Sequence, residues 1–302
     1  FWGISFADSL HGWVVGQDTA IVHTADGGLT WFRQDYDAVT SSSKDLYNVY
    51  ALDSNRVWVT GSGGTIMCTT DGGDNWIHQS SGHGGGIFDV YFTDSLNGYV
   101  VGGFCKGCIN GSPPWDAYLL NTSDGGETWS VVVDSTSDVN PLGFYGFDAS
   151  HDSAMAVGYD GNILCTWPLQ DVQQWYLKES HLHGDMFGVW YTDDSTGYVV
   201  GQFPSNCILK TTDSGQHWDP LSYPSINGYF SGLGFGDPMT GWVTGEGGII
   251  LKTEDAGNSW DLQNSGTSQN LDAFYCLNND LAWASGAYGT ILKTTGGGDT
   301  WQ

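Results

Sequence analysis

The stretch TADGGLTW, residues 24–31, is repeated along the whole chain and sets its architecture. The tryptophans that close the copies are 41 to 53 residues apart. A period of about 40–45 residues built from short strands predicts a β-propeller, with one four-stranded sheet per repeat. Seven repeats therefore predict seven blades. The other copies are TTDGGDNW (69–76), TSDGGETW (122–129), TTDSGQHW (211–218), TEDAGNSW (253–260), TTGGGDTW (294–301) and a degenerate copy between Cys165 and Trp175.

Two further patterns keep the same period. GWVVG (12–16) recurs once per repeat, for example as GYVVG (98–102), and an alternating apolar run such as FDVYF (88–92) precedes it. Such alternation of aromatic and β-branched residues is typical of strands. We expect an all-β fold, a single seven-bladed β-propeller with four-stranded antiparallel blades, closed into one ring over residues 1–302. The expected blades are approximately 1–34, 44–79, 86–133, 142–178, 185–221, 229–263 and 270–302.

Each position of the repeated phrase has a structural role. Asp26 can accept hydrogen bonds from turn amides, Gly28 can adopt a positive φ, and Trp31 can pack between neighbouring sheets. The last copy has Gly296 in place of the aspartate, and the fourth copy is so degenerate that we expect an irregular turn in blade 4. The residues predicted to act structurally are Asp26, Asp71, Asp124, Asp213, Asp255, Trp31, Trp76, Trp129, Trp218, Trp260 and Trp301.

The charge balance is strongly acidic. The chain has 34 acidic and 8 basic residues, which gives a net charge of −26. Such a field repels nucleic acid and anionic membranes, and no apolar run is long enough to span a bilayer. Most of the aspartates fit solvated turns, and calcium is the one candidate cofactor that their number suggests.

A glycine-rich insertion between Gly102 and Tyr118 lengthens the third repeat. It contains Cys105 and Cys108, but the chain offers no second cysteine pair for a zinc site, so we expect a disulfide that staples this loop. Asn110 and Asn121 begin two glycosylation sequons. Together with the acidity, these features favour a secreted or cell-surface protein.

Binding by propellers usually takes place in the loops at one rim. The residues with suitable chemistry in these loops are Trp115, His181, His183 and Phe203. The two histidines offer two metal ligands but lack an identifiable third, so we predict no metal site. No pair of residues stands out as catalytic.

The repeated phrase matches the Asp-box, a repeat of the bacterial-neuraminidase type. Sialidases with this repeat bind the substrate carboxylate through three arginines, whereas this chain contains only Arg33 and Arg56, which excludes that activity. The segments GGIILKTEDAGNSW (247–260) and YGTILKTTGGGDTW (288–301) resemble the photosystem II stability/assembly-factor family. The resemblance implies a seven-bladed Asp-box propeller without catalytic activity. The arginine patch for which that family is noted has no counterpart in this chain.

From these patterns we expect a non-catalytic extracellular module for protein interaction or structural assembly. A carbohydrate-binding or glycoside-hydrolase-like propeller that uses the loop rim is the alternative, and a photosystem assembly factor is the minor alternative. Blade 7 ends at Trp301 and Gln302 without an outer strand, so we expect residues beyond the chain ends or another molecule to supply it. Pairing with another molecule would make the protein a subunit of a filament or surface array. The expected partners are protein chains, including further copies of this one, or a glycan.

Overall fold

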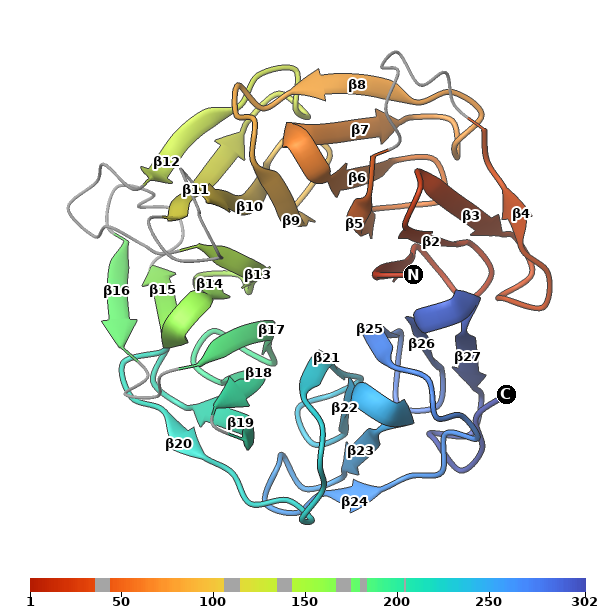
Figure 1. Cartoon of the computed structure of the whole chain (residues 1–302), viewed down its shortest axis with the longest axis vertical. Helices are drawn as coiled ribbons and strands as arrows, with labels where there is room; N and C mark the ends of the chain where they lie inside the picture. The colour runs from red at the N-terminus through yellow and green to blue at the C-terminus, as the bar shows by residue number, and fades with distance from the viewer. Residues whose placement is uncertain (36–43, 106–114, 135–142, 167–174, 180–183, 204) are drawn as a thin grey trace.

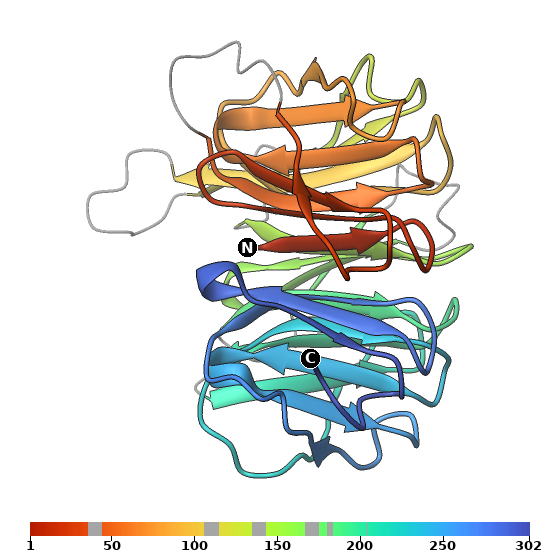
Figure 2. The ribbon, with the colours of Figure 1, turned by 90° about the vertical axis from the view of Figure 1, so that its right-hand side faces the viewer.

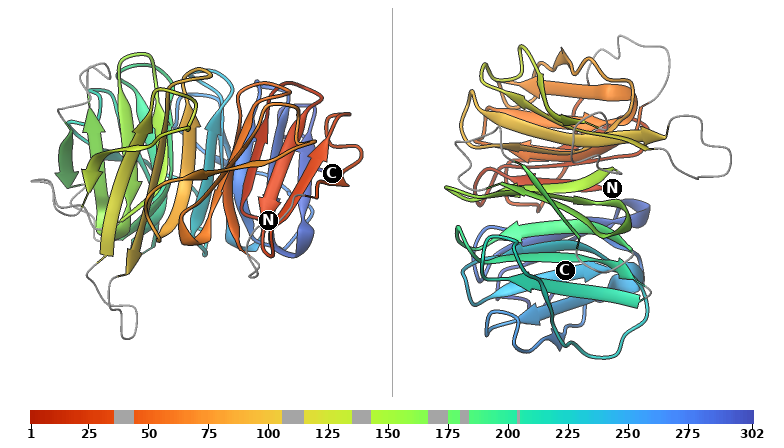
Figure 3. Two further views of the ribbon diagram at one scale, coloured as in Figure 1. Left: turned by 90° about the horizontal axis from the view of Figure 1, so that it is seen from above. Right: turned by 90° about the vertical axis from the view of Figure 1, so that its left-hand side faces the viewer.

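The chain forms a ring of seven antiparallel sheets around a central axis (Figure 1). This computed structural model describes residues 1–35, 44–105, 115–134, 143–166, 175–179, 184–203 and 205–302. The sheets follow one another in chain order, which confirms the predicted seven-bladed β-propeller. The side views show strands that run from one flat face of the ring to the other (Figures 2 and 3). Within the described part of the chain, no helix is long and apolar enough to cross a membrane.

The four strands of a blade run from the axis outward. The innermost strands are β1 (Gly3–Phe6), β5 (Leu46–Ala51), β9 (Gly86–Phe92), β13 (Phe144–Ala149), β17 (Asp185–Tyr191), β21 (Phe230–Phe235) and β25 (Leu271–Cys276). The second strands are β2 (Gly12–Gly16), β6 (Val57–Gly61), β10 (Gly98–Cys105), β14 (Ala154–Gly158), β18 (Gly197–Phe203), β22 (Gly241–Gly245) and β26 (Ala282–Gly286). The third strands are β3 (Ala20–Thr24), β7 (Thr65–Thr69), β11 (Trp115–Thr122), β15 (Asn162–Thr166), β19 (Ser205–Thr211), β23 (Ile250–Thr253) and β27 (Ile291–Thr294). The outer strands are β4 (Phe32–Arg33), β8 (Ile77–Ser80), β12 (Ser130–Asp134), β16 (Tyr176–Glu179), β20 (Asp219–Pro220) and β24 (Asp261–Leu262).

Short 3₁₀ turns connect the second and third strands in four blades: η1 (Ser62–Gly64), η2 (Tyr159–Gly161), η3 (Glu246–Gly248) and η4 (Ala287–Gly289). Blade 7 differs from the others because its sheet has three strands among the described residues. Gln302 nevertheless exchanges two backbone hydrogen bonds with Lys293 of β27, at 2.8 and 3.1 Å. This pairing corresponds to that of Asp261 with Lys252 in blade 6.

The Asp-box turn is held by a small hydrogen-bond network between a threonine and the aspartate. The hydroxyl of Thr24 accepts the amide hydrogen of Gly28 at 2.8 Å and donates to Asp26 at 2.8 Å. Asp26 also accepts hydrogen bonds from the amide and the hydroxyl of Thr30, at 2.9 and 2.6 Å. These bonds, first of all those from Thr30, lower the pKa of Asp26 to about 2. The same network surrounds Asp71, Asp124, Asp213 and Asp255.

The seventh copy shows how the turn forms without its aspartate. The hydroxyl of Thr294 accepts the amide hydrogens of Gly296 and Gly298, at 3.4 and 2.8 Å. These bonds, together with backbone hydrogen bonds from the amides of Gly297 and Asp299 to the carbonyls of Asp280 and Gly296, hold this turn without an aspartate. The turn expected to be irregular in blade 4 falls within residues 167–174, outside the described residues, although β15 and β16 pair on either side of it.

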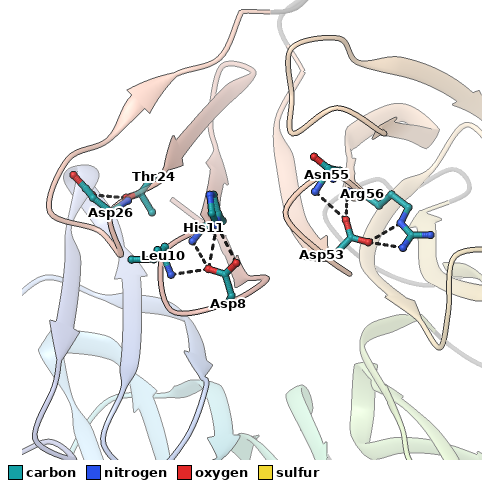
Figure 4. Close-up of polar contacts among 8 residues, drawn as sticks. All are labelled: Asp8, Leu10, His11, Thr24, Asp26, Asp53, Asn55 and Arg56. Carbon is teal, nitrogen blue, oxygen red and sulfur yellow. Dashed lines mark hydrogen bonds and ion pairs between the residues drawn. The ribbon is translucent and has the colours of Figure 1, made fainter.

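A second aspartate turn joins the first and second strands. Asp8 accepts the amide hydrogens of Leu10 and His11, at 2.7 and 2.8 Å, and Asp53 holds the equivalent turn in blade 2 (Figure 4). The carbonyl of Leu10 accepts the amide hydrogen of Gly27 at 2.8 Å, so this turn is tied to the Asp-box of its own blade. Much of the aspartate excess in the sequence thus lies in turns. Further turns of this kind use Asp94, Asp193, Asp237 and Asn278.

Aromatic rings fill the spaces between neighbouring blades. Phe6 of β1 stacks on Trp283 of β26 with ring centroids 3.7 Å apart, which joins the first blade to the last. The Asp-box tryptophan Trp31 packs edge-on against Phe6 at 6.0 Å. The first glycine of the GWVVG phrase leaves room for this arrangement in blade 1: a Cβ on Gly12 would lie 2.4 Å from the ring of Phe6. Equivalent stacked pairs join Phe92 to Trp58, Phe147 to Tyr99 and Phe235 to Tyr198.

The Asp-box turns predict a stabilising substitution. The residue that follows the aspartate position of the Asp-box has a positive φ. It is glycine or serine in five blades, whereas in blade 6 it is Ala256, with a φ of 57°. Replacing Ala256 with glycine relieves left-handed strain of about 1–2 kcal/mol. Against this gain stands about 0.4–1 kcal/mol of extra unfolded-state entropy. We expect Ala256→Gly to raise the free energy of unfolding by roughly 0.5–1 kcal/mol, measured by denaturant titration.

The matched control is Ala25→Gly. Ala25 is exposed, precedes the aspartate of the first Asp-box and has no positive φ. At Ala25 no backbone strain is relieved, so glycine only raises the entropy of the unfolded chain. The free energy of unfolding should therefore fall. Equal effects of the two substitutions would contradict the strain assigned to Ala256.

Candidate functional site

The innermost strands of all seven blades surround a cavity of about 710 Å³ on the ring axis. Its wall is formed by the innermost strands β1, β5, β9, β13, β17, β21 and β25, which surround the centre of the ring in Figure 1. Aromatic side chains make up much of the wall, and they form two layers at different depths. A concave, mostly apolar site with a few polar groups is the usual form of a ligand site.

The layer at the strand starts is a belt of six aromatic side chains, which we call the aromatic collar. Neighbouring ring centroids are 5.1 to 6.1 Å apart from one end of the belt to the other. Asp272 of β25 also lines the cavity and occupies the collar position of blade 7. The collar consists of Trp2, Tyr47, Phe88, Tyr145, Phe187 and Tyr229.

A β-bulge produces the collar position in blades 2 to 5. In β5, Leu46 pairs with Gly61 and Asn48 pairs with Thr60, so Tyr47 is an extra residue between two paired neighbours. The register shifts at the same place in blades 3 to 7. Bulges redirect a side chain and are common beside functional sites. The bulged residues of blades 3 to 7 are Phe88, Tyr145, Phe187, Ser231 and Asp272.

The deeper layer carries four aromatic residues and a carboxyl group. Tyr50 and Tyr91 lie with ring centroids 5.3 Å apart, and their hydroxyls donate to the carbonyls of Phe92 and Ala149, at 2.7 and 2.8 Å. Burial raises the pKa of both tyrosines, so both remain protonated donors at neutral pH. The other members of the layer are Trp190, Tyr275 and Asp148.

Two buried aspartates of the cavity wall connect neighbouring blades. Asp89 of β9 accepts the side-chain amide of Asn48 from blade 2 and the backbone amide of Phe147 from blade 4, the latter at 2.7 Å. Asp148 accepts the backbone amide of Tyr191 from blade 5 at 2.6 Å. Burial raises the pKa of Asp89 and of Asp148 to about 7. The bonds tie blades 2 to 5 together around the axis.

Charge in the cavity wall is one-sided. Asp89, Asp148 and Asp272 all line it, whereas none of the described lining residues is a lysine, an arginine or a histidine. Burial also raises the pKa of Asp272. Both arginines lie elsewhere: Arg56 is paired with Asp53 at 2.5 Å (Figure 4), and Arg33 is on the outer strand β4. The cavity therefore suits neutral or cationic ligands better than anions.

The side chains of the predicted rim residues lie outside the part of the chain that the structure describes. Trp115 begins β11, paired with Cys105, and Phe203 ends β18; only their backbones are described. Asn121 is half-buried within β11. Four other cysteines, Cys68, Cys165, Cys207 and Cys276, are free and buried. Cys108, Asn110, His181 and His183 lie outside the described residues.

The Asp-boxes lie at the face opposite the collar. Each follows the end of a third strand, which runs in the same direction as the first strand of its blade, whereas the collar lies at the first strand's start.

One described group, His151, Asp152 and Asp194, could offer three metal ligands within 4.8 Å. Asp194 already accepts hydrogen bonds from Ser150 and Asp152, at 2.7 and 2.9 Å. Calcium binding stays a prediction.

Residues 1–81 and 167–302 match the model of the family described as photosynthesis system II assembly factor YCF48. The chain belongs to this family. It is 32% identical to the photosystem II assembly lipoprotein Ycf48 of Prochlorococcus marinus (strain MIT 9313) over 273 residues, which cover 88% of this chain and 75% of that protein. The corresponding lipoprotein of Synechococcus sp. (strain CC9902) is 26% identical over 272 residues, 88% of this chain and 76% of the relative.

Solved structures of low sequence identity share the fold. The structure titled YCF48 bound to D1 peptide has a TM-score of 0.75 and 19% identity, and the match covers 97% of this chain and 91% of that one. A GH74 xyloglucanase from Xanthomonas campestris has a TM-score of 0.74 and 11% identity, over 99% of this chain and 53% of the enzyme. At these identities the likeness concerns the propeller alone.

The family match corrects the function expected from the sequence. The interpretation as an extracellular structural module, including a filament or surface-array subunit, is wrong, because the relatives are photosystem II assembly factors. The comparisons favour the minor alternative instead. They give no support to a glycan partner or to self-assembly. Most of the aspartates serve turn chemistry and therefore do not indicate a structural role outside the cell.

The buried carboxyl groups predict how stability depends on pH. A folded-state pKa of about 7 lies above the ordinary value of 3.8 for Asp148, so the folded protein holds a proton that the unfolded chain releases. The stabilising contribution is complete below the ordinary pKa and is lost as the pH rises through the folded pKa. We expect the melting temperature to fall between about pH 4.5 and about pH 7 and then to level off.

Asp148→Asn should make this decline shallower, because one titrating group is removed. Asp35→Asn, at a highly exposed side chain, is the matched control and should follow the unmodified protein. Melting curves recorded by circular dichroism across the pH range provide the measurement. Parallel slopes for the unmodified protein and Asp148→Asn would show that burial of this carboxyl does not set the pH dependence.

Proposed function

We propose that this protein is a photosystem II assembly factor of the Ycf48 type, which acts by binding a polypeptide segment and not by catalysis. The observation that carries the proposal is the family match, which includes blades 1, 2, 5, 6 and 7. A solved relative is titled as bound to D1 peptide, which supports a polypeptide as the class of ligand. Two curated relatives are named lipoproteins, which supports a location outside the cytoplasm.

The axial cavity supplies a binding site suited to this role. Rigid aromatic rings give a large contact area at a low cost in side-chain entropy, and they are frequent at sites where proteins bind one another. The innermost strands hold these rings on a closed sheet scaffold, so little ordering is needed when a ligand binds. The buried Asp89 and Asp148 are engaged in bonds between blades, which is a structural use of these carboxyl groups.

Complementation tests the proposal directly. We expect this chain, expressed in a cyanobacterial strain that lacks its own Ycf48, to restore accumulation of photosystem II measured by low-temperature fluorescence and by native gel electrophoresis. The strain's own Ycf48 is the positive control. A chain that accumulates as a folded protein in these cells and restores nothing would rule out this role in that host.

Binding to D1 provides the second measurement. Peptides that together cover the soluble segments of D1 are titrated against the purified protein, with the tryptophan fluorescence as signal. We expect at least one segment to bind saturably. An unrelated seven-bladed propeller is titrated with the same peptides as the control. If it binds the same segments equally well, the binding is not specific and the proposal loses this support.

A further inference from the structure

The aromatic collar combines ring faces with surrounding negative charge. From this combination we infer that the collar binds the cationic side chain, lysine or arginine, of the polypeptide segment that enters the axial cavity. The inference rests on the proposed function and names the chemistry that the bound segment must carry.

The ring geometry provides the first argument. The five successive collar pairs have interplanar angles of 51°, 22°, 71°, 37° and 60°, so faces and edges alternate irregularly around the opening. A cation within about 6 Å of an aromatic face is attracted by the ring quadrupole. Because the collar surrounds the axis, one side chain that enters along it can approach several faces at once.

The carboxylates beside the collar provide the second argument. Asp45 directly precedes β5, two residues before Tyr47 in the chain, and Asp185 begins β17, two residues before Phe187. Burial, and after it the negative charges of Asp272 and Glu246, raises the pKa of Tyr229. The collar is therefore surrounded by carboxylates that belong to four different blades.

Among the residues that the structure describes, positive groups near the collar balance only part of this charge. The amino group of Phe1 donates to the carbonyl of Gly286 at 2.8 Å and interacts with Asp272. Lys44 donates to the carbonyl of Gly63 at 3.2 Å and does not line the cavity. Asp45, Asp185 and Glu246 do not line the cavity either, but they add negative charge beside the collar and remain to attract an incoming cation.

The depth of the cavity favours a long side chain over a small free cation. Below the collar lies the deeper layer, with the rings of Tyr50, Tyr91 and Trp190 and the carboxyl of Asp148. Lysine and arginine pair an apolar stem with a charged head, and such stems pack readily against apolar surface. A stem that crosses the collar would contact the deeper rings, which a small ammonium ion lacks the length to do.

Short capped peptides of glycine and serine with one central lysine test the inference by isothermal titration calorimetry. We expect replacement of the lysine by acetyl-lysine, which keeps the stem and removes the charge, to weaken binding at least about tenfold. An arginine peptide should bind comparably and a glutamate peptide should not bind. Equal affinity for lysine and acetyl-lysine, or no binding of the lysine peptide, would overturn the inference.

Variants of the protein locate the site. Tyr47→Leu combined with Phe88→Leu removes two neighbouring collar rings and should weaken the lysine peptide at least about tenfold. Tyr288→Leu is the matched control: Tyr288 is 94% exposed in η4 and does not line the cavity, so its loss should change nothing. Asp185→Asn combined with Glu246→Gln leaves the rings in place and should weaken binding, which tests the charge even if the collar variant folds poorly.

Two further outcomes separate the alternatives. Tetramethylammonium should compete only at concentrations far above those of the lysine peptide; equal potency would assign the collar to small free cations instead. If the collar variant complements the Ycf48-deficient strain and binds D1 segments as the unmodified protein does, the collar inference fails and the proposed function stands. If neither the unmodified protein nor the collar variant complements the strain, the proposed function fails. The capped peptides then still show whether the collar binds a cationic side chain.

Discussion

The stacking of aromatic rings between blades is the contact on which the rest of the structure depends. A four-stranded blade of this size has two faces and can bury neither alone, so its core is completed by its neighbours. Phe6 on Trp283 and Phe92 on Trp58, both with ring centroids 3.7 Å apart, place the end of one blade's first strand on the second strand of the preceding blade. The contact between Phe6 and Trp283 also closes the ring, because it joins residues at opposite ends of the sequence.

Ring closure and the axial site are two properties of the same innermost strands. The end of each strand packs between blades, while the bulge near its start turns one side chain toward the axis. In a regular strand, residues three apart lie on opposite faces. The bulge changes this relation, so that Tyr47 and Tyr50 both line the cavity. In blades 2 to 7, a single added residue in the innermost strand therefore helps to convert a closed core into a lined channel.

The sequence predicted the features that repeat, and it could not predict those that depend on register. Asp26 and Trp31 recur at a fixed spacing, which was enough to predict seven blades. The bulge at Tyr47 leaves no mark in the sequence, because the residues around it alternate as in any strand. Nothing in the sequence distinguishes Asp89 and Asp148 from the other aspartates, yet they are buried between blades. Their environment is created by neighbours 58 and 43 residues away, Phe147 and Tyr191.

The acidity of the chain does not identify its function, but it restricts the partner's chemistry. Exposed turn positions accept aspartate at little cost to the fold, so net charge diverges easily between relatives that keep the same aromatic core. Arg56 is paired with Asp53, and Arg33 lies on an outer strand beside Asp35, so neither arginine offers positive charge at the collar. Asp45, Asp185 and Glu246 add negative charge beside the collar. The family relationship indicates a polypeptide, and the field at this opening selects, among polypeptide segments, those with a positive charge.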